Sequence, residues 1–420
     1  MPISNATGSI TLPNSAHPGD ALTRNQRLIY IVALGALVAL GPFTVDLYLP
    51  SFPAVARDFS ASDAAVQLTL TATSIGFAVG QLVIGPWSDK IGRRTPLLLA
   101  TALHIVASIG VAFAPNIELL TVLRVVQGIG AAGGGVVAMA TVRDLFGGQP
   151  LVRMLSRMAL VSGLAPILAP VIGSQLLRVT DWRGVFVALA AYGVLVVLVA
   201  ALLIVETLPP ERRGVGEHST ARARYHALFH DRVFVGVAII GGMIFSALFA
   251  YLSSSSFLLQ DVFGLNAQQF GLVFGLNSLG VVLGSQASSR VVRRVPPQWV
   301  LVVALPLMLL GAIAIGVFAL LGFGLISVLI PLWVILTSCG FCFPVVQVLA
   351  LAHHGEEAGT AASLLGAVNF GVAGLISPIV GLLGISTALP MAGVMAVTLV
   401  VALLSLWILV RPRTVPSIGD

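Results

Sequence analysis

The sequence predicts an all-α membrane protein in which twelve transmembrane helices form two six-helix bundles, with both chain termini on the cytoplasmic side. Three observations lead to this prediction: an apolar composition, a succession of long apolar segments, and an uneven division of basic residues between alternate loops. The first excludes a soluble domain, the second gives the number of spans, and the third gives their direction.

Composition alone separates this chain from soluble proteins. Of its 420 residues, 57% are hydrophobic and 9% are charged, and the mean hydropathy is +1.02. Soluble domains carry about 25% charged residues, which supply the polar surface that covers their core. We therefore expect a polytopic membrane protein.

Apolar segments long enough to cross a bilayer, about 20 residues each, recur along the chain. The polar stretch from Glu206 to Arg232 is the longest interruption, and it separates six segments from six. The predicted spans are residues 27–52, 65–87, 95–114, 118–141, 157–177, 184–205, 233–254, 268–289, 299–321, 324–348, 358–383 and 388–410. The expected divisions are a disordered cytoplasmic tail (1–25), a first bundle (26–206), a cytoplasmic linker (207–232), a second bundle (233–411) and a cytoplasmic tail (412–420).

The basic residues indicate the orientation, because Lys and Arg are retained in short cytoplasmic loops. Of the 22 basic residues, 18 fall in one set of alternate segments and three in the other, and Arg124 lies within a span. The richer set contains both termini, which are therefore predicted to be cytoplasmic. The sequence pI of 10.0 reflects charges that face anionic lipid headgroups, so membrane lipid is an expected partner and nucleic acid is not.

An internal repeat supports two related halves. Residues 80–94 align without gaps on residues 280–294, with three basic residues in register. Chance similarity between two helix-to-loop junctions is the alternative for so short a match, but each copy follows the second span of its half. Parallel six-span repeats with a binding site at their interface are the architecture of one large class of transporters.

Two ionisable residues, Asp46 and Arg124, lie deep within apolar spans. A lone charge there costs roughly 3 kcal/mol on insertion scales, so it persists when it is paired or has a function. At 1.5 Å per helical residue, the two lie roughly 10 and 9 Å below the external surface. They are therefore predicted to lie at the same level in one bundle.

This pair has a structural and a functional interpretation. A permanent buried salt bridge is the structural one, although its Coulomb energy need not exceed its desolvation cost. The functional one is a proton switch, because burial favours the neutral form of an aspartate and a nearby arginine favours the charged form. At an offset of 200 residues the second half has Ser246 and Gly324 instead, which confines coupling to the first half.

Several motifs resemble those of the major facilitator superfamily. Gly80-x-Leu82-x3-Pro86-x-Ser88-Asp89-Lys90-x-Gly92-Arg93-Arg94 is similar to its loop 2–3 signature, and Arg124-x-x-Gln127-Gly128-x-Gly130-Ala-Ala132 to its fourth-span motif. Residues 163–173 resemble its fifth-span antiporter motif. The segments that begin at Asp46, Arg143 and Glu206 narrow the resemblance to Bcr/CflA-type drug:proton antiporters, which include bicyclomycin and chloramphenicol/florfenicol exporters. The resemblance implies the major facilitator fold over residues 27–411.

The loop 2–3 motif is predicted to form a cytoplasmic gate. Gly80 allows close helix contact, and Gly92 allows a positive φ in a tight turn. Asp89 is expected to meet the positive N-terminal end of the eleventh span, and Arg93 to bridge Asp89 and Asp144 as a latch when the cavity faces outward. The alternative is that these charges only orient the loop.

The fifth-span motif contributes Gly163, Pro166, Pro170 and Gly173. Glycine permits close backbone approach, while proline removes a backbone donor and bends a helix. Pure packing explains the motif as well as a role in preventing a proton leak between the halves, so both interpretations stay open.

The substrate cavity is predicted to be mostly apolar with a few polar groups. Each polar candidate can equally bond a neighbouring helix. The candidate substrate-binding residues are Tyr48, Gln127, Phe249, Tyr251, Asn277, Gln347, Asn369 and Phe370.

Other noteworthy residues are predicted to be structural. Cys339 and Cys342 have redox spacing but apolar flanks, so we expect inert thiols at a helix contact. His104 is expected to be packed and hydrogen-bonded. His353 and His354 lack further ligands, so no metal or cofactor is expected, and the proton is the coupling ion.

The sequence thus predicts a monomeric, multi-pass transporter of the bacterial inner membrane that exchanges external protons for a small, mainly apolar drug. An exporter of an endogenous metabolite, such as an amino acid or peptide, is one alternative, although the second-half spans offer no charged partners. A non-transporting receptor is another, but the longest loop has only about 25 residues. No paired carboxylates or nucleophile cluster converge in the spans, so an enzyme is not expected.

Overall fold

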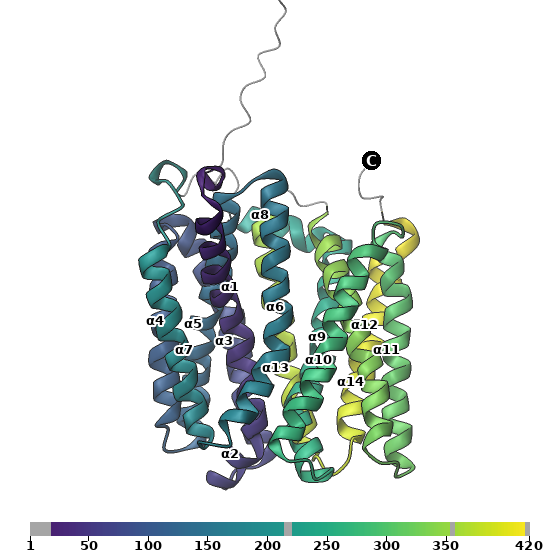
Figure 1. Ribbon diagram of the computed structural model, residues 1–420. Coiled ribbons are helices and arrows are strands. Elements are labelled where there is room, and N and C mark those ends of the chain that lie inside the picture. The colour runs from purple at the N-terminus through teal and green to yellow at the C-terminus, as the bar shows by residue number, and fades with distance from the viewer. Residues whose placement is uncertain (1–17, 214–220, 353–357, 416–420) are drawn as a thin grey trace, which may run out of the picture.

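The computed structural model describes residues 18–213, 221–352 and 358–415, and within these ranges every regular element is a helix. The long helices run side by side, with the first half of the chain next to the second (Figure 1). The predicted tails lie largely outside the described residues, as do His353 and His354.

Six long helices belong to each half. Those of the first half are α1 (Arg24–Asp46), α3 (Asp63–Ile91), α4 (Arg94–Ala112), α5 (Ile117–Leu145), α6 (Gly148–Leu176) and α7 (Trp182–Leu203). Those of the second half are α9 (Arg232–Phe257), α10 (Ala267–Val291), α11 (Pro297–Leu320), α12 (Leu325–Leu351), α13 (Ala358–Leu382) and α14 (Leu389–Ser405). The π-helical turns η4 (Leu258–Val262) and η5 (Leu406–Val410) extend α9 and α14.

Each predicted span coincides with one of these helices. Within the described parts of the chain, eleven helices are long and apolar enough to cross a membrane. The one predicted span not among these eleven is the fifth, which corresponds to α6; its apolar stretch Gly163–Leu176 is shorter than the helix that contains it. The prediction of an all-α protein is confirmed.

The predicted first span, residues 27–52, lies within one candidate span from Arg24 to Asp58, but this span is not one continuous helix. Helix α1 ends at Asp46 and is followed by the turn η2 (Leu49–Ser51) and the short helix α2 (Phe52–Asp58). Pro50 explains the break, because its nitrogen cannot donate a hydrogen bond to the backbone oxygen of Asp46. Asp46 is therefore the last residue of α1 and lies at a break in the span.

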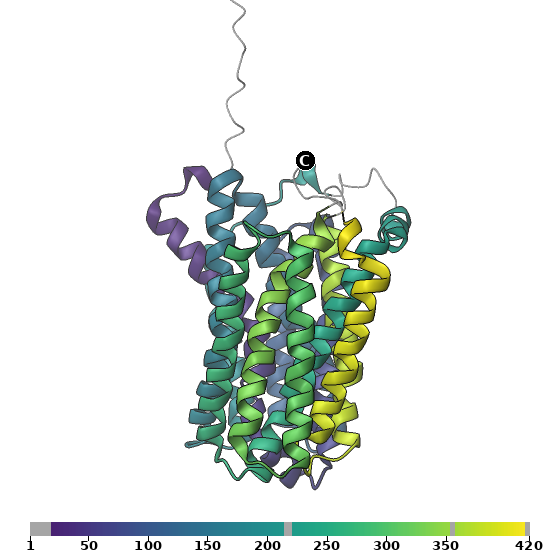
Figure 2. The same cartoon turned by 90° about the vertical axis from the view of Figure 1, so that its right-hand side faces the viewer.

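Three segments predicted to be tail or linker contain helix. At the start of the chain, η1 (Pro18–Ala21) precedes α1, and Thr23 and Gln26 form a capping box that begins α1 at residue 24. In the linker, η3 (Pro210–Arg212) and α8 (Ala221–His230) form before α9, and η6 (Pro412–Thr414) follows α14. Helix α8 lies across the direction of the long helices, as Figure 2 shows.

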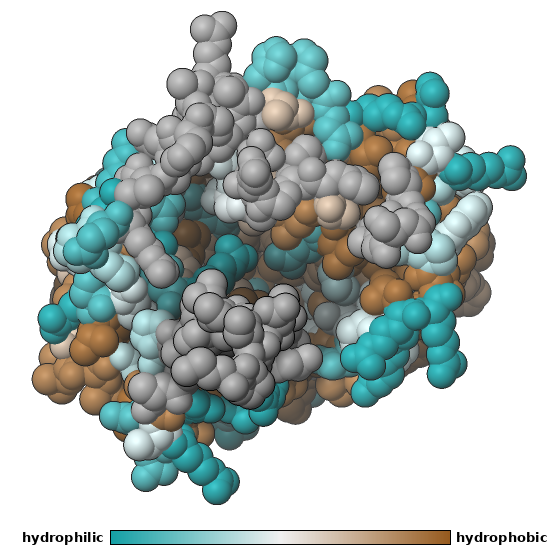
Figure 3. Space-filling view, turned by 90° about the horizontal axis from the view of Figure 1, so that it is seen from above, coloured by the Kyte–Doolittle hydropathy of each residue, from teal (hydrophilic) through white to brown (hydrophobic). Residues whose placement is uncertain are grey.

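The two ends of the bundle differ. The first and last described residues lie at one end, here called the terminal end, and α2 lies at the opposite or distal end (Figure 1). Seen from the terminal end, the surface is hollowed between the two halves, with hydrophilic residues around the hollow (Figure 3). The halves are joined mainly by α3 packed on α13 and by α6 packed on α10.

Glycines allow the closest helix contacts within each half. A Cβ on Gly128 of α5 would lie 2.2 Å from the backbone oxygen of Thr73 in α3, and one on Gly76 would lie 2.1 Å from the oxygen of Val125. In the second half, a Cβ on Gly284 of α10 would lie 2.0 Å from the oxygen of Thr337 in α12. The second and fourth spans of both halves thus pack in the same way, which agrees with an internal duplication.

We predict that Gly128→Ala destabilises the protein by about 1–3 kcal/mol, because the added methyl group forces α3 and α5 apart. Gly135→Ala in the same helix is the matched control, since nothing lies within 4 Å of a Cβ at that position. Thermal unfolding in detergent, followed by fluorescence, measures both. Similar melting temperatures for the two variants would contradict the prediction.

Candidate proton-coupling and gating sites

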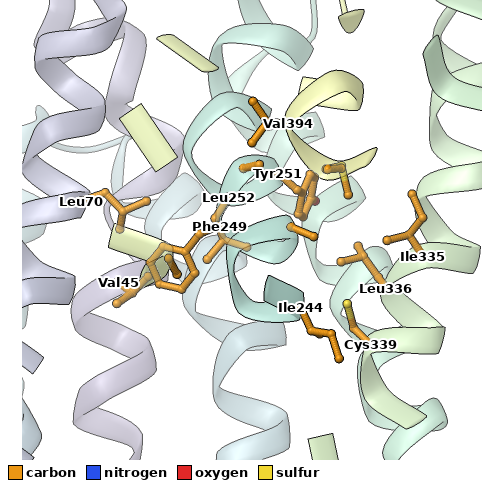
Figure 4. Packing of buried hydrophobic residues seen from close by; sticks show 14 of the residues in the cluster. Val45, Leu70, Ile244, Phe249, Tyr251, Leu252, Ile335, Leu336, Cys339 and Val394 are labelled. Carbon is orange, nitrogen blue, oxygen red and sulfur yellow. The ribbon is translucent and has the colours of Figure 1, made fainter. Parts of the chain in front are cut away.

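Asp46 is the one fully buried carboxylic acid among the described residues, with 5% of its surface exposed. Its neighbour Val45 belongs to a hydrophobic cluster that also contains Leu70 of α3 and Phe249 of α9, so this cluster joins the two halves (Figure 4). Asp46 therefore lies next to a cluster that joins the two halves.

Arg124 is completely buried in α5 and is held by neutral groups. Its Nη1 donates to the backbone oxygen of Thr44 at 2.9 Å and to Oε1 of Gln127 at 2.6 Å. Its guanidinium lies over the rings of Tyr48 and Phe186, 5.0 and 5.5 Å from their centroids. Nε and Nη2 have no hydrogen-bond partner among the described residues. Aromatic faces and carbonyl dipoles therefore take the place of a counter-ion.

Asp46 and Arg124 do not form an ion pair in the part of the chain that the structure describes. The alternative of a permanent buried salt bridge is therefore wrong for this conformation. Arg124 instead bonds the backbone oxygen of Thr44, two residues before Asp46, and the amide oxygen of Gln127. The two residues still belong to neighbouring helices of one half, as predicted.

A hydrogen-bond network surrounds Arg124. Gln127 donates from Nε2 to the hydroxyl of Ser108 at 2.7 Å, and the hydroxyl of Ser108 donates to the backbone oxygen of His104 at 2.7 Å. His104 shares a 2.9 Å hydrogen bond with the Thr44 hydroxyl, so it is packed and hydrogen-bonded as expected. Gln127, predicted as a substrate contact, is thus occupied in positioning Arg124.

The remaining first-half candidate, Tyr48, is also buried within the protein. Its ring packs on Phe52 and Phe186 at centroid distances of 4.9 Å each, and its hydroxyl lies 3.5 Å from that of Thr69. Tyr48 is therefore a core residue, and the face of its ring lies under the guanidinium of Arg124.

Tyr251 and Asn277 form a polar pair inside the second half. Asn277 donates from Nδ2 to the hydroxyl of Tyr251 at 3.1 Å, and the Tyr251 ring stacks on Phe274 at 5.3 Å. Because the Tyr251 hydroxyl accepts this bond, its own proton remains available to another acceptor. The structure thus brings these two sequence-predicted residues together.

Phe249 and Phe370 belong to an aromatic cluster that crosses between the halves. Phe370 of α13 stacks on Phe77 of α3 with centroids 5.1 Å apart, and presents its edge to Phe245 and Phe249 at 5.2 and 6.1 Å. Phe343 packs on Phe245 at 5.4 Å. Sequence reasoning missed Phe77, Phe245 and Phe343; only the four-residue spacing of Phe245 and Phe249 on one helix could have indicated part of the cluster.

The two other candidates lie apart from each other. Gln347 is exposed and lines a shallow depression of about 440 Å³ at the end of α12, together with Pro344, Val348, Leu351 and Ala352. Asn369 points its Oδ1 at α9, where a Cβ on Gly241 would lie 2.8 Å away, and this oxygen has no hydrogen-bond partner among the described residues.

Arg93 bridges two carboxylates at the terminal end, as predicted. Its Nε donates to Oδ2 of Asp144 at 2.8 Å, and its Nη1 donates to Asp89 and to the hydroxyl of Ser88. Burial opposes the charge of Arg93, but the hydrogen bonds to Asp144 and Asp89 outweigh it and raise the pKa of the guanidinium. Within the described residues Asp89 bonds Arg93 of its own half. The start of the eleventh span adjoins residues 353–357, which lie outside the described residues, so the expected contact of Asp89 there stays a prediction.

Glu206 completes this network and was missed as a site residue, although its segment was noted in the sequence. It accepts hydrogen bonds from the backbone N–H groups of Arg93 and Arg94 at 2.8 and 3.2 Å, and so caps the start of α4. Partial burial opposes its ionisation, but bonds from the N–H groups of Arg93, Leu208 and Arg94 lower the pKa of the carboxyl group below its usual value.

The two gate glycines have the roles that the sequence suggested. Gly92 ends α3 with φ of +106°, and a Cβ there would lie 2.4 Å from Oε2 of Glu206. Gly80 lets α3 approach α5, because a Cβ would lie 2.8 Å from the side chain of Ala132.

The fifth-span motif packs α6 against both halves. A Cβ on Gly173 would lie 2.1 Å from the backbone oxygen of Leu47, and one on Gly163 would lie 3.3 Å from Val282 of α10. Helix α6 continues through Pro166 and Pro170 to Leu176. The motif therefore forms part of the contact between the halves. This position is compatible with both interpretations of the motif, helix packing and prevention of a proton leak.

The described residues contain no group of three or more His, Cys, Asp or Glu side chains that could hold a metal ion. Cys339 and Cys342 are free thiols, fully buried in α12.

Residues 32–378 match the profile of the Major Facilitator Superfamily. The chain belongs to this superfamily. It is therefore a transporter and not an enzyme, and its apolar helices make it a multi-pass protein of the bacterial inner membrane.

Similar proteins span nearly the whole chain. The "Uncharacterized MFS-type transporter YdgK" of Bacillus subtilis (strain 168) is 35% identical over 93% of this chain and 98% of its own length. The "Bicyclomycin resistance protein homolog" of Haemophilus influenzae is 31% identical over 92% and 97%. The "Multidrug resistance protein MdtL" of Vibrio parahaemolyticus is 24% identical over 91% and 96%.

Solved structures of transporters share the fold. The xylose transporter XylE from E. coli, in a partially occluded inward open conformation, has a TM-score of 0.75 at 14% identity and covers 94% of this chain and 99% of its own. A bacterial homolog of the human lysosomal transporter Spinster has a TM-score of 0.72 at 16% identity, over 94% and 98%.

We predict that Glu206→Gln lowers stability by about 1 kcal/mol at pH 7 and by less at low pH. Because folding lowers the pKa of this carboxyl group, its ionised form stabilises the protein above the ordinary pKa of about 4.3. That contribution is lost as the pH falls through the lower folded-state pKa. Thermal unfolding of both proteins at pH 7 and pH 3.5 measures this, with the exposed Glu211→Gln as control. An equal difference at both pH values would contradict the prediction.

Proposed function

We propose that this transporter exports small, mainly apolar drugs in exchange for external protons, and that Asp46 carries the proton. The observation that supports this most directly is the position of Asp46: a buried acid at the end of α1, without an ion pair among the described residues. The names of two relatives, which refer to bicyclomycin and multidrug resistance, support the choice of substrate.

The terminal end is proposed to face the cytoplasm. This follows from the 18 basic residues in the loops and termini on that side. The conformation is then closed on the external, distal side and hollowed toward the cytoplasm (Figure 3). The Arg93 bridge is formed in this conformation, so the bridge alone does not close the terminal end.

The geometry suggests how proton binding is linked to movement. Asp46 follows Thr44 by two residues, and the backbone oxygen of Thr44 holds Arg124. A rocking movement that changes the helix break would alter both the exposure of Asp46 to water and its distance from Arg124. Arginine stays charged throughout, so it can act as a fixed electrostatic reference.

A neutral substrate is favoured over an amino acid or peptide. The second-half candidates Tyr251, Asn277 and Asn369 are uncharged, and the neighbouring aromatic cluster offers ring faces. A zwitterion would leave its charged groups without partners there, which is costly in an apolar site. A receptor role is set aside because the chain belongs to a transporter family.

We expect Asp46→Asn to abolish proton-coupled export. In an efflux-deficient host, the variant should lower drug resistance at least tenfold relative to the unaltered protein, and everted vesicles should show no drug-induced loss of the pH gradient. Glu118→Gln, an exposed acid in the first turn of α5, is the matched control and should behave normally. Full resistance and drug-induced proton movement in Asp46→Asn would refute the proposal.

We expect Arg124→Lys to reduce transport about tenfold or more although the charge is kept. Lysine cannot reproduce the planar group that bonds Thr44 and Gln127 and lies over two aromatic rings. The same vesicle assay measures the effect, and Arg143→Lys at an exposed position is the control. Normal transport by Arg124→Lys would show that charge alone suffices.

A further inference from the structure

Two long seams join the halves, and each runs between antiparallel helices. On α3 and α13, the ring of Phe77 stacks on Phe370, and a Cβ on Gly381 at the distal end would lie 2.6 Å from Oε1 of Gln67. On α6 and α10, a Cβ on Gly271 would lie 2.4 Å from the hydroxyl of Ser174. In both seams the distal ends are in close contact.

Gln67 connects the halves at the distal end of the first seam. It is fully buried in α3. Its Nε2 donates to the backbone oxygen of Ser253 in α9 at 3.2 Å, and its Oε1 accepts from the backbone N–H of Gly381 in α13 at 2.9 Å. Both ends of the amide are therefore used, and both partners belong to the other half.

Gln268 connects the halves at the distal end of the second seam. It lies in the first turn of α10, half-buried, and its Nε2 donates to the backbone oxygen of Ser174 in α6 at 2.8 Å. This bond also runs from one half of the chain to the other.

The two glutamines are related by the internal repeat. Each lies near the start of the second span of its own half, and each bonds the backbone at the end of the fifth span of the other half. They are 201 residues apart, within one residue of the 200-residue offset of the loop motif. The duplication therefore places one amide on each side of the cavity.

The other bonds between the halves at this end are weak or also neutral. Gln260 of η4 donates to the backbone oxygen of Pro50 at 3.0 Å. The ion pair of Arg57 and Asp261 is 3.8 Å long and largely exposed, so it contributes little.

We propose that Gln67 and Gln268 are positioning residues for transport, a symmetry-related pair of clasps that hold the distal end closed and must both release when the cavity opens there. An amide suits this task. When the seam opens, water can replace its backbone partners at small net free energy, whereas a buried ion pair would be costly to form and to separate.

The test measures the distance between the halves directly. Spin labels are placed on Val179→Cys and Leu383→Cys, two exposed positions just beyond α6 and α13. Cys339 and Cys342 are buried, so the parent protein should remain unlabelled. Double electron–electron resonance is recorded on the doubly labelled full-length transporter carrying Gln67→Ala, Gln268→Ala or both. Gln175→Ala, an exposed glutamine next to Ser174, is the matched control.

Each single variant should raise the ratio of distally open to closed molecules about fivefold, and the double variant about 25-fold if the clasps act independently. The control should match the unaltered protein. An unchanged distance distribution in the double variant would overturn the proposal. If Gln67→Ala folds poorly, as judged by size-exclusion chromatography, the half-buried Gln268→Ala decides the matter alone, by the same criterion.

This inference goes beyond the proposed drug export and depends only on the transport cycle of the family. The measurement uses neither drug nor pH gradient. Its failure would therefore leave the role of Asp46 untouched, just as a normally active Asp46→Asn would leave the clasps untouched.

Discussion

The first half of the protein has to hold a permanent positive charge away from water, and much of its arrangement follows from this constraint. Removing a guanidinium from water is costly unless oriented dipoles replace the solvent. Around Arg124 these are the backbone oxygen of Thr44, the amide oxygen of Gln127 and the faces of Tyr48 and Phe186. Because Arg124 pairs with no carboxylate among the described residues, a change in the charge of Asp46 would break no ion pair there.

The two ends of the molecule use different chemistry. At the terminal end, charged groups around Arg93 bond one another within a single half, so this network can persist while the halves move. At the distal end, neutral amides such as Gln67 and Gln268 bond backbone atoms of the other half. Contacts that have to be made and broken in every cycle are better built from groups that water can replace.

The predictions that succeeded depended on local or repeated patterns. The spans follow from apolar length, and the Arg93 bridge follows from a motif whose charged residues lie near helix ends. The predictions that failed concerned where a helix ends and which residues its side chains contact. Asp46 was placed inside a continuous helix because Pro50 and Pro53 were read as part of the span, whereas α1 ends at Asp46 and the turn η2 follows it. Phe77 and Phe370 could not be matched, because nothing in either segment indicates its partner.

By itself, the sequence determined the class of protein, the number of spans, the duplication and the few residues that can carry charge through the apolar interior. These properties depend on composition and on the order of residues within short segments, and both can be read directly from the sequence. The tertiary structure decided that Asp46 and Arg124 remain unpaired, that an aromatic cluster crosses the halves, and that a neutral amide of each half bonds the backbone of the other at the distal end. These depend on which helices meet and on how each side chain is turned, because hydrogen bonds and ring contacts act only over a few ångströms.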